Sequence, residues 1–184
     1  MPKIGSLLLL LLLGALHPVN YEPLNDIHFD NTLILVSDDV EVYTPNETTY
    51  TEKFITYELK IIDSYIRRFA ESNNLPTEKC IDSDLKVFIV DESILNDKER
   101  YPVTTNYVTT RWAMYDPYPL DDNLSAIILS DRSETLIDQI LFGHEMSHYW
   151  YDTRCWDAYV DDTESLALEF QDFYTVERFG RRIR

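Results

Sequence analysis

Positive charge is scarce in this sequence. The 184 residues include 16 Lys and Arg against 33 Asp and Glu, so the formal net charge is −17. Such a chain repels a phosphate backbone within the screening length, which excludes nucleic acid as an expected partner. The one basic cluster in the sequence is Arg178, Arg181, Arg182 and Arg184. We interpret it either as a helix C-terminus that complements the helix dipole or as a docking tail.

The sequence also has no apolar segment long enough to be an obvious membrane-spanning helix. Lys3 precedes an unbroken apolar run over residues 7–13, which is shorter than the roughly 20 residues that a spanning helix needs. A basic residue followed by a short apolar run is typical of a secretory signal peptide. We therefore predict a signal over residues 1–17 and an exported protein. The alternative is an uncleaved anchor, and only that alternative predicts membrane association.

Cysteine is rare, with Cys80 and Cys155 as the two examples. In an exported chain this pair predicts one disulfide, whose loop would stabilise the fold by about 4 kcal/mol in the chain-entropy model. Two separate thiols are the alternative. A third possibility is that Cys155 ligates a metal.

Internal repeats and low-complexity tracts beyond the leucine run are absent, and the length suits one domain over residues 18–184. Apolar runs and β-branched residues predict strands, and apolar spacing at helical period predicts helices. The expected strands are a strand or hairpin over 33–43 and strands over 107–114, 85–91 and 125–130; the expected helices cover 52–72, a segment from 131 and a segment from 161. These elements predict an α+β fold.

The segment FGHEMSHYW, residues 142–150, carries the clearest chemical pattern. On a helix His144 and His148 project from one face at a separation that a single tetrahedral ion can bridge. Glu145 lies about 100° round the helix from His144, beside such an ion rather than on it. Both histidines continue the apolar stripe of Ile137 and Leu141, so two buried core histidines are the alternative. The combined spacing favours a metal site.

A third ligand is needed, and histidine cannot supply it. The chain has four histidines, of which His17 lies in the signal and His28 far upstream. The donor must be a carboxylate or, less favourably, Cys155. Glu164 and Glu169 flank the apolar stripe of the last helix on opposite sides, so periodicity alone does not choose between them.

HEMSH followed by ESLALEFQDFY resembles the gluzincin metallopeptidases, in which a glutamate in an E-x-x-A context joins two histidines. Residues 164–167 match that pattern, with Ala167 small enough to let the helices approach. The resemblance, over about residues 125–178, implies Zn²⁺ held by His144, His148 and Glu164. It further implies a small single-domain zincin-like fold, a mixed sheet packed on a scaffold helix and an active-site helix. Glu169 stays open as the alternative ligand.

The resemblance implies a zinc metallopeptidase acting on a peptide or protein, and the expected signal adds that it is exported. Glu145 is the expected general base that takes a proton from the attacking water. Tyrosine is the residue type expected to stabilise the oxyanion, with packing as the alternative role of each candidate; the candidates are Tyr107, Tyr115, Tyr151 and Tyr174. The strand over 125–130 is expected to form the cleft wall, where a substrate can pair as an added strand. The competing hypothesis is a secreted acidic binding protein with a structural, non-catalytic metal.

Overall fold

The computed structural model describes residues 32–37, 40–44, 52–90, 113–116, 124–131 and 136–180. The expected signal over residues 1–17 lies outside these ranges, as do Tyr107 and the arginines at 181, 182 and 184. Within the described part, no helix has both the length and the apolar character required to cross a membrane.

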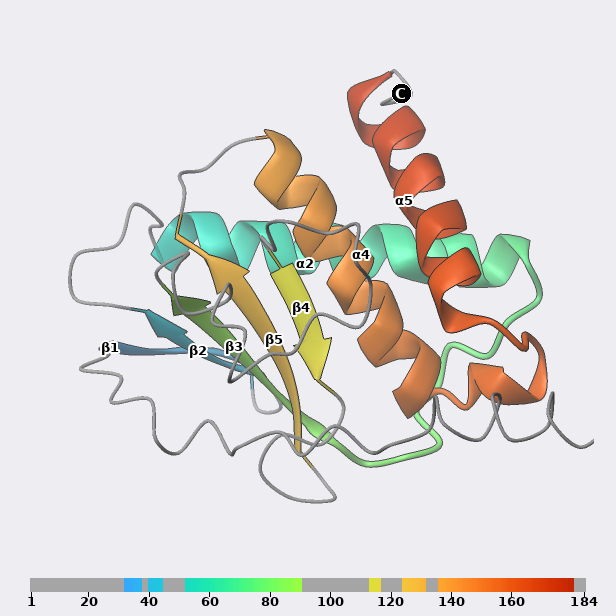
Figure 1. Cartoon of the computed structure of the whole chain (residues 1–184), viewed down its shortest axis with the longest axis horizontal. Helices are drawn as coiled ribbons and strands as arrows, with labels where there is room; N and C mark the ends of the chain where they lie inside the picture. The colour runs from blue at the N-terminus through green and yellow to red at the C-terminus, as the bar shows by residue number, and fades with distance from the viewer. Residues whose placement is uncertain are drawn as a thin grey trace, which may run out of the picture.

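Five strands form one mixed sheet in the order β1-β2-β3-β5-β4 (Figure 1). They are β1 (Thr32–Ser37), β2 (Val40–Thr44), β3 (Asp84–Val90), β4 (Ala113–Asp116) and β5 (Leu124–Ser130). β2, β3 and β5 are parallel, whereas β1 is antiparallel to β2 and β4 is antiparallel to β5. The two continuous apolar runs of the sequence became β3 and β5, inside the sheet, where both faces of a strand are covered.

The segment expected as a strand or hairpin over 33–43 forms two antiparallel strands, β1 and β2, which agrees with the hairpin alternative. Another strand prediction differs from the structure in its bounds. The strand expected over 107–114 appears as β4, which begins at Ala113 and continues to Asp116. Residues 107–112 lie outside the described ranges.

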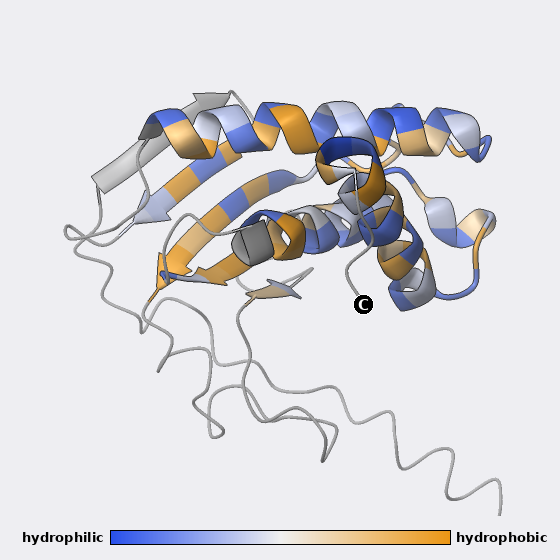
Figure 2. Ribbon diagram, turned by 90° about the horizontal axis from the view of Figure 1, so that it is seen from above, coloured by the Kyte–Doolittle hydropathy of each residue, from blue (hydrophilic) through white to orange (hydrophobic). Residues whose placement is uncertain are grey.

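Helix α2 (Glu52–Ser72) lies along one side of the sheet (Figure 2). Hydrophobic and hydrophilic bands alternate along it, as expected of an amphipathic helix. The predicted apolar stripe is buried, with Ile62 and Ile66 fully inaccessible to solvent. The helix ends before Asn74, whose positive φ of 57° marks the left-handed turn that asparagine tolerates.

Two further helices follow β5, namely α4 (Leu136–Thr153) and α5 (Thr163–Phe179), with the short 3-10 helix η2 (Trp156–Ala158) between them. In Figure 1, α4 runs beside β4 and α5 lies next to α4. Asp162 caps α5 by accepting hydrogen bonds from the backbone N–H groups of Glu164 and Ser165. The cap expected at the start of α4 includes residues 132–135, which are not described.

Small residues allow α4 and α5 to approach closely. A Cβ atom at Gly143 would lie 3.3 Å from two ring carbons of Tyr174 and 3.5 Å from Phe170. Both rings are fully buried, so they have little room to move. Ala167, which the sequence placed at this contact, is also buried.

The core lies between one face of the sheet and the helices. Val42, Val87 and Ile127 occupy matching positions on neighbouring strands and therefore share that face. They pack in one cluster with α2 and α4, including Ile62 and Trp150. This cluster positions α4, the helix that carries the two histidines.

Arg178 has a role that the sequence did not indicate. Its guanidinium forms two 2.6 Å bonds with the carboxylate of Glu58 on α2, and it also donates to the hydroxyl of Tyr174. Glu58 is only 1% exposed, so this is a buried ion pair whose loss would leave a charge unpaired. Arg178 therefore joins α5 to α2 rather than belonging to a docking tail.

Cys80 and Cys155 form the predicted disulfide, with their Cα atoms 6.1 Å apart. The bond ties the connection between α2 and β3 to Cys155, two residues beyond the end of α4. Around it, the backbone N–H groups of Cys80 and Ile81 donate to the carbonyl of Thr153, and the Trp156 indole donates to Pro76. The alternative of Cys155 as a metal ligand is wrong because its sulfur is in the disulfide.

The α+β class, the mixed sheet and the single small domain of the described residues are as predicted. α2 is the expected scaffold helix, and α4 is the helix that carries the His144–His148 pair.

Candidate metal centre

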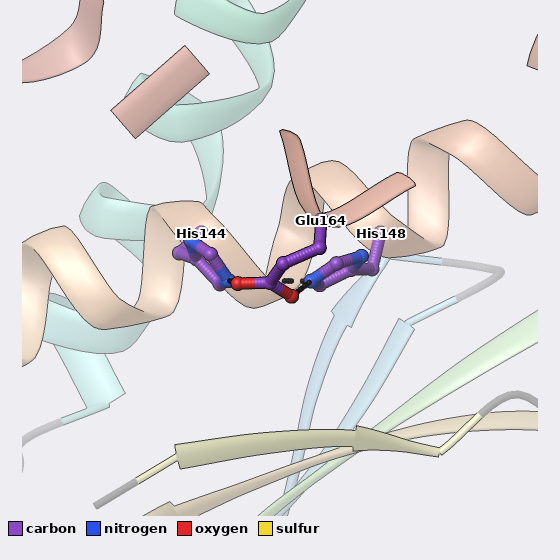
Figure 3. Close-up of side chains that lie close together, drawn as sticks. All are labelled: His144, His148 and Glu164. Atoms are coloured by element: carbon purple, nitrogen blue, oxygen red, sulfur yellow. Dashed lines mark hydrogen bonds and ion pairs between the residues drawn. The ribbon is translucent and has the colours of Figure 1, made fainter. Parts of the chain in front are cut away.

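His144 and His148 lie one turn apart on α4 and face the same side of the helix (Figure 3). Their Nε2 atoms are 3.2 Å apart. His144 is 9% exposed and His148 is half-buried. The i, i+4 spacing therefore brings two imidazole nitrogens to one point, as the sequence predicted.

Glu164 reaches the same point from the first turn of α5 (Figure 3). Its Oε1 lies 3.5 Å from Nε2 of His144, and its Oε2 lies 3.4 Å from Nε2 of His148. Among the described residues, these three side chains form the group whose ligand atoms all lie within 4.8 Å of one another. Glu169 is exposed on α5 and is not part of the group. The structure therefore places Glu164, and not Glu169, against the histidines.

The donor spacing suits a small tetrahedral ion. Donors at about 2.0–2.1 Å from such an ion lie roughly 3.4 Å from each other. The two Nε2 atoms are 3.2 Å apart, and they lie 3.5 Å and 3.4 Å from different oxygens of the Glu164 carboxylate. Two neutral nitrogens and a carboxylate oxygen are also a donor set that zinc accepts. The residues present thus fit a divalent metal ion.

The neighbouring residue on α5 orients one of the rings. Nδ1 of His148 lies 2.9 Å from the hydroxyl oxygen of Thr163. Such a contact fixes the ring and directs the opposite nitrogen, Nε2, toward the metal position. Among the described residues, no hydrogen bond of the buried Nδ1 of His144 is found. Sequence reasoning missed Thr163, since its only signal is its place directly before Glu164.

Burial keeps both rings uncharged. The pKa of His148 is lowered to about 4, first by burial and also by repulsion from His144 when that ring is protonated. Burial also lowers the pKa of His144, against the opposing effects of the Glu164 carboxylate and the Gln171 side chain. Metal binding requires the neutral imidazole, so at pH 7 neither ring has to lose a proton first.

The three donors open into a cavity of about 380 Å³. Its described lining consists of Ala113, Met114, Tyr115, His144, Glu145, His148 and Glu164. Glu145 is 9% exposed and lies outside the three-donor group, as expected for a residue beside the metal rather than on it. The side chain of Glu164 is 62% exposed, so the site is accessible to solvent.

The cavity wall differs from the one predicted. β5, residues 124–130, is paired on both sides, with β3 and with β4. Over residues 126–129 both edges of β5 are paired, so an added strand cannot pair with it there. The prediction of substrate pairing on this strand is wrong, because β4 lies between β5 and the cavity.

Three of the four candidate tyrosines are described, and the hydroxyl of each forms a hydrogen bond with a residue outside the donor group. Tyr115 stacks its ring on His148, with centroids 6.0 Å apart, and donates its hydroxyl to Asp152 at 2.8 Å. Burial raises the pKa of Asp152 against the effect of this bond. Tyr151 donates to the carbonyl of Val160, and Tyr174 accepts from Arg178. The packing alternative therefore describes these three tyrosines in the structure.

Comparison with protein-family models gives no match for this chain, and comparison with curated proteins gives none.

Proposed function

We propose that this protein is a zinc-dependent metallopeptidase that hydrolyses peptide bonds. One observation carries the proposal: two imidazoles and a carboxylate are spaced for one tetrahedral ion, and Glu145 lies beside them on an open cavity. Three protein donors with an accessible cavity are typical of catalytic zinc sites, whereas structural sites are closed by four. The resemblance of HEMSH and E-x-x-A to the gluzincins supports the same activity.

Each residue then has a definite task. His144, His148 and Glu164 hold the metal, which when bound lowers the pKa of a water molecule and polarises a carbonyl group. Glu145 accepts the proton of the attacking water and later delivers it to the leaving amine. Thr163 keeps Nε2 of His148 directed at the metal. Tyr115 holds β4 against α4 through its ring contact with His148 and its bond to Asp152.

The second candidate function is an acidic binding protein with a structural metal. The net charge of −17 favours it in general terms, because a strongly acidic surface suits a cationic partner. A closed structural site needs a fourth protein donor, and the donor considered for that place, Cys155, is in the disulfide. The described residues supply three donors to the group, so we favour the enzyme.

Export forms part of the same proposal. The disulfide between Cys80 and Cys155 is compatible with an oxidising compartment, where such bonds persist. The basic residue and apolar run within residues 1–17 support secretion.

The deciding experiment compares Glu145→Gln with the parent protein. The amide keeps the size of the side chain but cannot accept a proton, so peptide hydrolysis should fall by about 10²–10⁴-fold. Zinc content, measured by atomic emission, should stay near one ion per chain because Glu145 is outside the donor group. Glu169→Gln, an exposed glutamate on α5, is the matched control and should retain full activity.

A parent that holds zinc but cleaves no peptide library would favour the structural-metal candidate. A variant that cleaves as fast as the parent would remove Glu145 from the mechanism.

A further inference from the structure

A second cavity lies on the opposite side of α4 from the metal donors. Two residues along an α-helix correspond to a rotation of about 200°, so Met146 and Trp150 face away from His144 and His148. Met146 and Trp150 line this second cavity together with Tyr149 and Arg154, and its volume is about 390 Å³. We refer to it as the α2–α4 pocket, because α2 supplies the facing wall.

The α2–α4 pocket gathers positive charge in a strongly acidic protein. Lys60 and Arg67 of α2 line the pocket. Lys79, in the connection from α2 to β3, and Arg154, the residue after α4, also line it. They are four of the 16 cationic residues of a chain whose net charge is −17. Among the described lining residues, one acid, Asp63, accompanies them. The charge around this pocket therefore has the opposite sign to that of the molecule as a whole.

Aromatic rings and neutral oxygens orient the cations. The guanidinium carbon of Arg154 lies 3.5 Å from the ring centroid of Trp150, and that of Arg67 lies 5.5 Å from the same ring. Arg154 is 7% exposed and donates to the carbonyl of Thr77. Lys79 donates to the carbonyl of Ser83 at 3.2 Å. These contacts orient the side chains around the pocket.

The rest of the lining is apolar. Val40 of β2, Leu59 of α2 and Met146 of α4 form this part, beside the rings of Tyr149 and Trp150. Cavities of about 300–1,000 Å³ with an apolar lining and a few oriented polar groups are typical of small-molecule sites. An apolar wall next to cations suits a ligand with an apolar body and an anionic group.

We propose that the α2–α4 pocket binds a small organic anion that carries a carboxylate or phosphate group on an apolar or aromatic body. The anionic group lies against Lys60 and Arg67, and the body lies beside the apolar part of the lining. This site is separate from the metal centre and does not depend on the peptidase proposal, because its lining residues do not include the metal donors or Glu145.

Phenyl phosphate is a suitable probe because it combines both features. Titration at constant ionic strength, followed by calorimetry and tryptophan fluorescence, should give saturable binding with a change in Trp150 emission. Inorganic phosphate tests the anionic group alone, and phenol tests the body alone. Each should bind at least about tenfold more weakly than phenyl phosphate, since each lacks one half of the interaction. Trp150→Phe should bind the probe by calorimetry but lose the fluorescence change.

The double variant Lys60→Ala/Arg67→Ala should weaken phenyl phosphate binding by about tenfold or more, because it removes two charge-assisted contacts. Its matched control is Lys53→Ala/Arg68→Ala, which removes two cations from the same helix outside the pocket. All four side chains are on exposed residues, so both variants should fold and melt close to the parent. The control should bind normally.

Three results would overturn the proposal: no saturable binding at millimolar phenyl phosphate, equal weakening in both double variants, or equal affinity for phenyl phosphate and inorganic phosphate. Equal weakening would mean that net charge alone attracts the probe. Equal affinity would mean that the apolar wall contributes nothing.

Discussion

At the scale of single residues, the chemistry of this protein is concentrated in few side chains. His144, His148 and Glu164 form one donor group, and Glu145 lies beside it on the same cavity. The sequence predicts the relative positions of the two histidines more directly than that of Glu164. The histidines share one helix, so their spacing is fixed locally, whereas the glutamate comes from another helix.

Replacing each of the two candidate glutamates with alanine tests the donor group directly. Glu164→Ala should lose zinc because it removes one of three ligands, and a lost ligand weakens binding strongly. Glu169→Ala should retain zinc, since Glu169 is exposed and outside the group. Equilibrium dialysis with radioactive or fluorescent zinc competition measures both affinities. If Glu169→Ala loses the metal and Glu164→Ala keeps it, the ligand assignment is reversed.

Thr163 provides a test of how the ring of His148 is held. Thr163→Val removes the hydroxyl that lies 2.9 Å from Nδ1 while keeping a similar shape. Zinc affinity should fall by about 10–100-fold, the usual cost of losing a contact that orients a ligand. Thr163→Ser keeps the hydroxyl and should restore most of the affinity. Equal affinities in the parent and both variants would show that the contact does not orient the ring.

At the scale of elements, α4 is held by the elements that pack on it and by contacts after its last turn. Its apolar face packs on the sheet and α2, and Gly143 lets α5 approach to carry Glu164 into place. After its last turn, the disulfide and the bonds to the carbonyl of Thr153 tie it to the segment that follows α2. A helix fixed in this way keeps His144 and His148 in position for the proposed metal.

The disulfide should contribute measurably to this restraint. Cys80→Ser/Cys155→Ser opens a loop closed across a sequence separation of 75. The free energy of unfolding should fall by about 4 kcal/mol, chiefly because the unfolded chain gains entropy. Urea denaturation of the parent and the variant measures the difference. Thiol titration of the denatured parent without reductant should find no free cysteine, and two free thiols would contradict the assignment.

At the scale of the whole molecule, charge is distributed unevenly. The net charge of the chain is −17, yet four cationic residues line the α2–α4 pocket. This pocket lies on the opposite side of α4 from the metal donors. At the metal centre, the carboxylate of Glu164 lies against two uncharged imidazole rings. Coordination bonds to a bound ion would stabilise this arrangement, and they are lost when the ion is removed.

Metal removal should therefore destabilise the whole domain. A ligand that binds only the folded state adds stability by mass action, about 4.1 kcal/mol at a free concentration of 1,000 times its Kd. Chelation should lower the melting temperature of the parent, and added zinc should restore it. Glu164→Ala should melt at the same temperature with and without chelator. A parent whose melting is unaffected by chelator would contradict a metal that is bound in the native state.

The sequence by itself determined what depends on neighbours along the chain. Apolar spacing located α2, α4 and α5, the i, i+4 rule aligned His144 with His148, and the scarcity of cysteine left one disulfide to form. Only the tertiary structure decided what depends on contact between distant segments. It chose Glu164 over Glu169, placed Tyr115 on Asp152, and paired Arg178 with Glu58. It also put β4, not β5, beside the metal site. The physical reason is that periodicity fixes the face of a helix on which a side chain lies, while packing fixes what that face meets.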